Sequence, residues 1–332
     1  MKTMKLSAFN YHLPKSRIAQ QPLLKRDNAK LMVLSSQGIA HQHFYSVPDY
    51  LQKDDVLVIN TTKVRKAKLV GTKSTGAKIE LVHIKKIGDL SECRIKGHRI
   101  KEGTMLCFGE LRGEIVRNVH DVFFVRFNRN IDSYLEDNGN LPLPFYITKK
   151  LDNEQEYQTS YASEEGSLAA PTAGLHFTHS LLDSIRKKGV IIVSLCLHIG
   201  FGTFLPIRGD QIEEHIMHEE YFEISKKSAQ LINQRKGRLF VVGTTVVRAL
   251  EAAFSGGIVH QGNSKTRIYI YPGYTFKNKI NGMITNFHLP KSSLLLLVSA
   301  YYGRNKILNA YKEAIRKKYR FYSFGDAMLL LK

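Results

Sequence analysis

The amino-acid sequence predicts an α/β protein whose mostly parallel sheet with helices is interrupted by an inserted small antiparallel β-barrel domain. Strand-like and helix-like segments alternate in the second half of the chain, which is typical of a parallel sheet covered by helices. Short strand-like runs separated by glycine and polar residues fill residues 64–146, as in small barrels. Extended segments in the first 60 residues can complete the sheet. We therefore expect a discontinuous α/β domain, residues 1–63 and 150–332, around a barrel domain, residues 64–149.

The first half of the chain is expected to supply strands to both domains. After a helix-like start, strands are expected at residues 30–35 (KLMVLS) and 55–60 (DVLVIN), which are short apolar runs typical of buried strands. The proline-rich LPLPFYI at residues 141–147 is interpreted as the linker that leaves the inserted domain. The expected barrel strands are residues 78–84, 92–95, 104–108, 113–117 and 122–127.

In the second half of the chain, expected helices and strands follow one another. A short apolar strand is also expected just before the segment ITNFHLPKS at residues 284–292. In open α/β sheets, ligands bind beyond the carboxyl ends of the strands, so the turns that follow these strands are where a site is expected. The strands are expected at residues 190–198, 238–243 and 267–271, and the helices at residues 180–188, 225–236, 246–254, 292–302 and 306–318.

The most unusual bulk property is the charge. Forty-nine lysines and arginines against 29 aspartates and glutamates give a net charge of +20, and a field of this sign attracts polyanions. The basic residues are dispersed rather than gathered in a long block, with the densest clusters at residues 65–73 and 312–320. A dispersed basic surface suits a folded RNA better than a charged tail does. A compositional bias toward lysine is the alternative explanation.

The composition argues against several other classes of protein. Hydrophobic residues make up 43% of the chain and charged residues 23%, as in ordinary globular proteins. The longest apolar run near the C-terminus, residues 294–298, is far shorter than the roughly 20 residues that span a bilayer, and the first residues lack the apolar core of a signal peptide. The three cysteines, Cys93, Cys107 and Cys196, have no CxxC spacing. We expect a cytoplasmic protein that binds no membrane.

Two nucleotide-binding motifs are incomplete in this sequence. GTKSTGAK at residues 71–78 has the glycine spacing of a P-loop, but Ala77 and Lys78 occupy the positions of the lysine and of the magnesium-binding hydroxyl residue. A β-hairpin turn is the better interpretation of this segment. Gly200 and Gly202 follow an expected strand as in a dinucleotide-binding loop, but the third glycine is missing.

A metal site is also poorly supported. His215 and His218 have a spacing that places two ligands on one helical face. No third ligand follows at a recognisable spacing, so we expect no metal ion to be bound there.

The loop AAPTAGLHFT at residues 169–178 is the first candidate site. Pro171 fixes its φ angle, and Gly174 permits backbone conformations closed to other residues. Thr172 can form hydrogen bonds, and His176 can exchange a proton near neutral pH. A purely structural role, as a connection from a strand to a helix, explains the threonine at the end of the loop, which can cap the helix. The same role explains the other residues of the loop much less well.

Three more turns that follow expected strands carry polar side chains. Free backbone N–H groups and two hydroxyls at a helix N-terminus favour a carboxylate or a phosphate. Each turn alone is explained by capping or by core packing, but three such turns at one edge of a sheet indicate a binding site. The turns contain His198 before Gly200, Gly202 and Thr203; Thr244 and Thr245 before Arg248; and Asn286, His288 and Lys291.

With these segments in view, the chain closely resembles the S-adenosylmethionine:tRNA ribosyltransferase-isomerase family of queuosine biosynthesis. The resemblance runs nearly from end to end, and its blocks occur in the expected order. The blocks are residues 17–34 (RIAQQPLLKRDNAKLMVL), 56–64 (VLVINTTKV), 75–82 (TGAKIELV), 157–162 (YQTSYA), 169–178 (AAPTAGLHFT), 197–207 (LHIGFGTFLPI), 215–224 (HIMHEEYFEI), 242–251 (VGTTVVRALE), 284–300 (ITNFHLPKSSLLLLVSA) and 319–329 (YRFYSFGDAML).

The resemblance implies a reaction and its substrates. The ribosyl group of S-adenosylmethionine, a co-substrate, would be transferred and rearranged onto 7-aminomethyl-7-deazaguanine in the wobble position of tRNA, giving epoxyqueuosine-tRNA, adenine and methionine. S-adenosylmethionine supplies a good leaving group through its sulfonium, so no metal or redox cofactor is expected. No obligate protein partner is evident. The family architecture, an α/β domain with an inserted β-barrel, agrees with the fold predicted above.

The same hypothesis assigns roles to the candidate residues. His176 and His198 are the leading candidates for proton transfer, followed by His218 and Glu220, and Asp326 would orient a base or bind the deazaguanine. A second set is expected to bind the co-substrate: Thr172, Gly174, Gly200, Gly202, Thr203, Thr244, Thr245 and Arg248. A third set is expected to meet tRNA or substrate: Asn286, His288, Lys291 and Arg320.

The sequence departs from the family pattern at two places, and two other functions are compatible with its composition. Residues 11–15 (YHLPK) are basic where the family often has acidic residues, and Thr61 replaces a common aspartate, which excludes a catalytic carboxylate there. The alternatives are a non-catalytic basic RNA-binding protein and an S-adenosylmethionine-dependent RNA methyltransferase. The products formed from S-adenosylmethionine separate these hypotheses.

Overall fold

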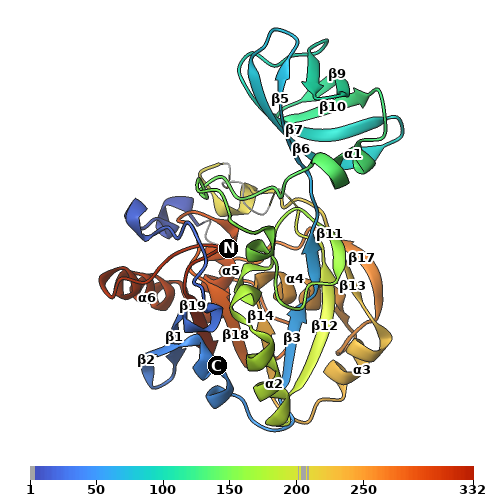
Figure 1. The fold of residues 1–332 in the computed structure, drawn as a ribbon. Helices are drawn as coiled ribbons and strands as arrows, with labels where there is room; N and C mark the ends of the chain where they lie inside the picture. The colour runs from blue at the N-terminus through green and yellow to red at the C-terminus, as the bar shows by residue number, and fades with distance from the viewer. Residues whose placement is uncertain (1–3, 201, 203–206, 208) are drawn as a thin grey trace. The chain divides into compact units, whose positions relative to one another are not determined.

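The computed structural model describes residues 4–200, 202, 207 and 209–332. The chain forms two compact units, a larger unit of Met1–Lys63 with Pro144–Lys332 and a smaller unit of Val64–Leu143 (Figure 1). The chain returns to the larger unit at Pro144 rather than at residue 150. The reason is that Tyr146, in the expected linker, packs its ring 4.7 Å from the ring of Tyr322.

The larger unit is built around one open sheet that combines both segments of the chain. Among the described residues its order is β17-β13-β12-β3-β14-β18-β19-β1-β2 (Figure 1). β3 from the first segment lies between β12 and β14 from the second, with Val56 paired to both Ile191 and Leu239. The strands are β1 (Lys30–Ser35), β2 (Gly38–His43), β3 (Val56–Asn60), β12 (Ile191–Leu197), β13 (Glu220–Ile224), β14 (Leu239–Val242), β17 (Gly262–Thr266), β18 (Gly282–Asn286) and β19 (Ala327–Leu331).

The sheet is mixed, which corrects the expectation of a mostly parallel sheet. β12, β3, β14 and β18 run parallel, and β19 runs parallel to β1. Antiparallel pairs join β17 to β13, β13 to β12, β18 to β19, and β1 to β2. Parallel pairing therefore holds for the four central strands and for the separate pair of β19 and β1. A short hairpin connection forces β1 and β2 to be antiparallel, and the antiparallel strands β13 and β17 were not expected from the sequence.

Both faces of the sheet are buried. In β3, Val56 and Val58 pack with residues of α3, α4, α5 and α6, whereas Leu57 and Ile59 pack with α2. This arrangement follows from the alternation of side chains along a strand, and it explains why β3 is apolar without interruption. The helices are α2 (His179–Lys187), α3 (Lys226–Asn233), α4 (Thr244–Ala253), α5 (Ser293–Tyr302) and α6 (Arg304–Arg316).

Side-chain caps begin most of these helices close to where the sequence places them. Thr178, Ser225 and Ser292 accept hydrogen bonds from the backbone N–H groups of the first turns of α2, α3 and α5. α4 begins two residues earlier than expected, at Thr244, and follows Gly243 without a side-chain cap. Its first N–H groups are therefore left for another acceptor.

Two local predictions are wrong. Residues 267–271 are not a strand, and the strand lies five residues earlier as β17 (Gly262–Thr266). The carbonyl of Ile268 accepts a hydrogen bond from Arg248 Nε, 3.3 Å away, instead of a strand partner. The helix-like start of the chain forms only short 3₁₀ turns, such as Leu6–Phe9.

The smaller unit is a closed antiparallel barrel of strand order β10-β7-β6-β5-β8-β9, as predicted. Its interior is apolar, and residues 71–78 form the β5–β6 hairpin, with Gly76 at a φ of 82°. This result confirms a hairpin rather than a P-loop. The elements are β5 (Lys68–Lys73), β6 (Lys78–Ile87), β7 (Leu90–Lys96), β8 (Met105–Phe108), β9 (Leu111–Val119), β10 (Val122–Phe127) and α1 (Ile131–Asn138).

Candidate functional site

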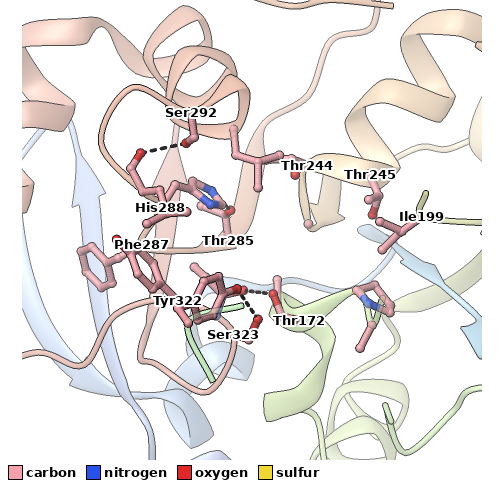
Figure 2. A pocket seen from close by; sticks show the side chains of 18 residues that line it. Thr172, Ile199, Thr244, Thr245, Thr285, Phe287, His288, Ser292, Tyr322 and Ser323 are labelled. Atoms are coloured by element: carbon pink, nitrogen blue, oxygen red, sulfur yellow. Dashed lines mark hydrogen bonds between the residues drawn. The ribbon is translucent and has the colours of Figure 1, made fainter. Parts of the chain in front are cut away.

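A pocket opens in the larger unit at the carboxyl ends of β14 and β18. Its empty space is about 690 Å³, a value that includes the open mouth. Its walls are residues 170–173, residues 243–245 at the start of α4, and residues 285–289 after β18; Tyr322 and Ser323 close one side (Figure 2). The walls come from distant parts of the chain and converge where open α/β sheets bind ligands.

The start of α4 forms one wall and presents unsatisfied polar groups. Gly243 adopts a φ of 89°, a conformation that favours glycine, and turns the chain directly from β14 into the helix. Thr244 and Thr245 are both buried and both line the pocket. The Thr245 hydroxyl is fully enclosed and has no hydrogen-bond partner among the described residues. The free N–H groups of the first turn provide donors for an acceptor, preferably an anion. The Thr245 hydroxyl would join them only when a ligand displaces the side chains that enclose it.

A hydrogen-bond chain runs from the pocket into the core. Thr172 Oγ1 donates to Asn286 Oδ1 at 2.8 Å, and Asn286 Nδ2 lies 3.5 Å from His176 Nε2. Thr172 and Asn286 line the pocket, but His176 does not. The proton of Thr172 is thus committed to Asn286, and its oxygen lone pairs remain to accept a hydrogen bond from a ligand.

His176 lies in a second, smaller pocket behind the first. Arg26, Phe324 and Leu175 line that pocket with it, and its ring packs 4.8 Å from the ring of Phe44. Burial lowers the pKa of His176 to about 4, against the opposite effect of a hydrogen bond to the Arg26 backbone. The imidazole is therefore neutral at pH 7 and reaches the larger pocket only through Asn286.

His198 faces away from the larger pocket. It follows β12 directly, and the next residue, Ile199, lines the pocket in its place, as expected because side chains alternate along an extended chain. His198 Nδ1 lies 2.8 Å from Thr62 Oγ1, and its ring stacks on Tyr221. Burial lowers the pKa of His198. Gly166 is close to this ring, and a Cβ there would lie 2.7 Å from His198 Cε1.

Glu220 and Arg248 form a buried ion pair that joins β13 to α4. Arg248 Nη1 donates to Glu220 Oε2, and both side chains are at most 3% exposed. The other carboxylate oxygen accepts the backbone N–H of Gly200 at 3.1 Å. Neither Glu220 nor Arg248 lines the pocket. The pair fixes the segment after β12 beside the pocket instead of offering a free base or a free cation to a ligand.

His288 and Thr285 face the pocket from the end of β18. His288 Nε2 lies 2.9 Å from Thr285 Oγ1, and both residues line the pocket (Figure 2). The backbone of His288 is held on both sides, because its N–H donates to Tyr311 Oη and its carbonyl accepts from Tyr11 Oη. Burial lowers the pKa of His288 to about 3, so the ring is neutral.

The structure places Asp326, Arg320 and Lys291 outside the larger pocket. Asp326 is buried and accepts the backbone N–H groups of Lys30 and Arg320, at 2.9 and 2.7 Å. The Arg320 guanidinium donates to the carbonyls of Gln21 and Phe324. Lys291 is exposed and adopts a φ of 56°. Asp326 and Arg320 hold the turn that contains Tyr322 and Ser323.

The two remaining glycines are explained by packing. A Cβ at Gly174 would lie 2.1 Å from Tyr161 Oη, and one at Gly202 would lie 2.1 Å from His218 Cδ2. His218 itself is exposed and does not line the larger pocket. Thr203 lies outside the described residues.

Several residues that line the pocket were not predicted from the sequence. Tyr146 and Ser323 bond through their hydroxyls at 2.7 Å and close one side together with Tyr322. Tyr322 adopts a φ of 72°, which is rare for a bulky residue and marks a constrained position. The polar YSFG turn before Asp326 was the available signal, whereas Tyr146 was hidden in a segment interpreted as a linker.

No group of three or more His, Cys, Asp or Glu side chains is arranged to hold a metal ion within the part of the chain that the structure covers. No helix in the same part is long and apolar enough to cross a membrane. The expectation that the protein needs no metal stays a prediction.

A pocket of this kind, at the strand ends of an α/β unit, is typical of enzymes that act on small molecules. The model of the family described as queuosine biosynthesis protein matches residues 6–330. The chain therefore belongs to the queuosine biosynthesis protein family, which confirms the resemblance found in the sequence.

Full-length relatives carry one name. The S-adenosylmethionine:tRNA ribosyltransferase-isomerase of Moorella thermoacetica is 48% identical and covers 99% of this chain and 100% of its own length. The protein of the same name from Desulfitobacterium hafniense is also 48% identical, with the same coverage. The crystal structure of S-adenosylmethionine tRNA ribosyltransferase from Thermotoga maritima is 32% identical over 98% of this chain and 100% of that chain, with a TM-score of 0.56.

Proposed function

We propose that this protein is an S-adenosylmethionine:tRNA ribosyltransferase-isomerase. It transfers and isomerises the ribosyl group of S-adenosylmethionine onto 7-aminomethyl-7-deazaguanine in the wobble position of tRNA. The products are epoxyqueuosine-tRNA, adenine and methionine. The observation that carries this proposal is the 48% identity to relatives of that name over their whole length.

The pocket supports the proposal because its polar groups suit the co-substrate. The start of α4, with Thr244 and Thr245, would hold the carboxylate of S-adenosylmethionine at the positive end of the helix dipole. Thr172 would accept a hydrogen bond from a ligand hydroxyl or amino group, since its own proton goes to Asn286. Apolar side chains such as Ile199, Leu289 and Leu294 line the pocket between these groups.

His176 is proposed as a positioning residue rather than as a base that touches the substrate. It is neutral, fully buried behind Asn286, and fixes the Asn286 amide that orients Thr172. His198, Glu220 and Asp326 each have partners within the protein and lie outside the pocket. We assign these three to the support of the surrounding loops and to no proton transfer.

We also propose a domain organisation, the binding partners and the cellular compartment of the reaction. The larger unit is the catalytic domain, and the smaller unit is an inserted β-barrel domain. tRNA and S-adenosylmethionine are the binding partners, without a metal or redox cofactor, and the reaction takes place in the cytoplasm.

The test is an analysis of small-molecule products after incubation with S-adenosylmethionine and precursor tRNA. We expect adenine and methionine in equal amounts and no S-adenosylhomocysteine. The matched control is the same tRNA with unmodified guanine in the wobble position, which should release no adenine. S-adenosylhomocysteine without free adenine would support a methyltransferase, and tRNA binding without any product would support a non-catalytic RNA-binding protein.

A further inference from the structure

Among the histidines named as candidates, one presents its ring to the larger pocket. His176 lies behind Asn286, and His198 contacts Thr62 outside the pocket. His288 lines the pocket itself (Figure 2). Its backbone is fixed by Tyr11 and Tyr311. The ring is therefore held in one place before a ligand arrives, which lowers the entropic cost of binding.

The partner of His288 decides which ring nitrogen carries the proton. Thr285 is 1% exposed, and among the described residues its hydroxyl has one partner, His288 Nε2 at 2.9 Å. A buried hydroxyl proton without an acceptor is costly. The Thr285 O–H therefore donates to Nε2, and the neutral imidazole must carry its own proton on the other nitrogen, Nδ1.

His288 lines the pocket, and its Nδ1–H group has no acceptor among the described residues. Nor is it enclosed like the Thr245 hydroxyl, because it is not one of the fully buried polar atoms that lack a partner. An acceptor on a ligand would complete the chain Thr285 O–H to His288 and His288 Nδ1–H to ligand.

We propose that the His288–Thr285 pair is a binding site for an uncharged hydrogen-bond acceptor of the adenosine part of S-adenosylmethionine. The inference rests on the proposed function and specifies which part of the substrate meets this wall. A neutral imidazole offers a dipole and no net charge, so it suits a purine ring nitrogen or a ribose oxygen. The carboxylate would lie at the start of α4 instead. Leu289 and Leu294, which also line the pocket, supply the apolar surroundings that a nucleoside needs.

Two substitutions separate binding from support at this position. In His288→Asn the side-chain amide nitrogen reaches the position of Nδ1, so the donor to the ligand is kept while the acceptor for Thr285 is lost. In His288→Gln the amide reaches the position of Nε2, so Thr285 keeps an acceptor while the ligand loses its donor. The probes are adenosine and S-adenosylmethionine, titrated calorimetrically, and the unfolding of each variant is measured in urea.

We expect opposite patterns for the two variants. His288→Gln should unfold like the wild type and bind both probes about tenfold more weakly, the effect of one hydrogen bond. His288→Asn should bind both probes within about threefold of the wild type but unfold at lower urea, because the Thr285 hydroxyl is left unpaired. Thr285→Val, which removes that hydroxyl, should restore the stability of His288→Asn.

Other results overturn the proposal. Equal weakening of binding by the Asn and Gln variants would show that His288 acts only through packing. Wild-type binding by His288→Gln would show that no ligand atom meets Nδ1. The product analysis above is independent of these titrations. A wild-type protein that binds both probes but releases no adenine would refute the proposed function, while the comparison of the two variants would still decide the role of His288.

Discussion

His176 illustrates how burial, more than any other influence, sets the protonation state of a residue at this site. An imidazole in water has a pKa of about 6.5, whereas burial lowers that of His176 to about 4. The folded protein therefore stays unprotonated at this position over a range of pH in which the unfolded chain takes up a proton. The residue is suited to hold Asn286 in place through a neutral ring nitrogen, and it is poorly suited to accept a proton at pH 7.

This depressed pKa predicts a pH-dependent stability. Because the unfolded chain binds the proton first, the free energy of unfolding is fully retained above about pH 6.5 and falls as the pH drops toward 4. The loss for this residue is on the order of 3 kcal/mol. His176→Gln should flatten the dependence in that window, as measured by urea unfolding at a series of pH values. His288, whose pKa is also lowered, should leave a residual slope; an unchanged slope in His176→Gln would contradict the assignment.

The Glu220–Arg248 ion pair is the second place where a single substitution is expected to change the free energy of unfolding strongly. Both side chains are almost fully buried, so removing one charge leaves the other without compensation. Glu220→Gln should lower the free energy of unfolding by about 3–5 kcal/mol. The control is Asp183→Asn, which breaks an ion pair with Arg186 whose side chains are more than half exposed and should cost less than about 1 kcal/mol. Equal losses in urea unfolding would argue against the buried pair as a structural link.

At the scale of elements, the start of α4 is the feature that most directly prepares the pocket. In α2, α3 and α5 a serine or threonine oxygen satisfies the first N–H groups, whereas α4 and α6 each follow a glycine without a side-chain cap. Of these two helices, α4 begins at the pocket. An enclosed hydroxyl without a partner destabilises the free protein. That cost is understandable if the same groups are satisfied when a ligand binds.

The start of α4 therefore predicts that one substitution weakens the binding of S-adenosylmethionine without destabilising the free protein. Thr245→Val removes the unpaired hydroxyl at nearly constant volume, so the free protein should be unchanged or more stable, while S-adenosylmethionine should bind about tenfold more weakly. Ser299→Ala is the matched control, since the Ser299 hydroxyl in α5 is also enclosed without a partner among the described residues and does not line the pocket. Wild-type affinity in Thr245→Val would remove α4 from the binding site.

Elements were predictable from the sequence where local signals decide them. β1 has its expected bounds, residues 30–35, and α2 and α5 begin at the threonine and serine caps that the sequence displays. The failures are non-local. Pairing of β13 with β12 and β17 depends on contacts between segments far apart in the chain. The carbonyl of Ile268 is taken by an arginine side chain, which no periodicity reveals.

The same distinction applies to the site. The rule that ligands bind after strands selected Thr244, Thr245, Asn286 and His288, and the composition of the loop 169–178 selected Thr172. All five residues line the pocket. It could not show which side chains already have partners inside the protein. Glu220 and Asp326 carry the right chemistry for acid–base work, but each is held by groups distant in sequence. Partner choice is a property of the folded chain, so residue type and spacing alone did not reveal it.

At the scale of the whole molecule, the net positive charge of the chain does not come from the residues that line the pocket. The pocket is lined by neutral groups, while the chain carries a net charge of +20, with an excess of lysine and arginine in both units. Small-molecule binding in the pocket should therefore depend on dipoles and hydrogen bonds. Binding of a polyanion to the outside should depend on the release of its counterions.

This separation predicts two different responses to salt. If tRNA is held chiefly through its phosphates, the logarithm of its affinity should fall linearly with the logarithm of salt concentration, by about 0.9 per contact in duplex-like regions. The affinity for adenosine should be nearly flat over the same range, because no charge is neutralised in binding it. Fluorescence anisotropy of labelled precursor tRNA and calorimetry of adenosine, each between 50 and 300 mM salt, make the comparison. A flat response for tRNA would mean that base and shape contacts dominate and that the excess charge reflects composition alone.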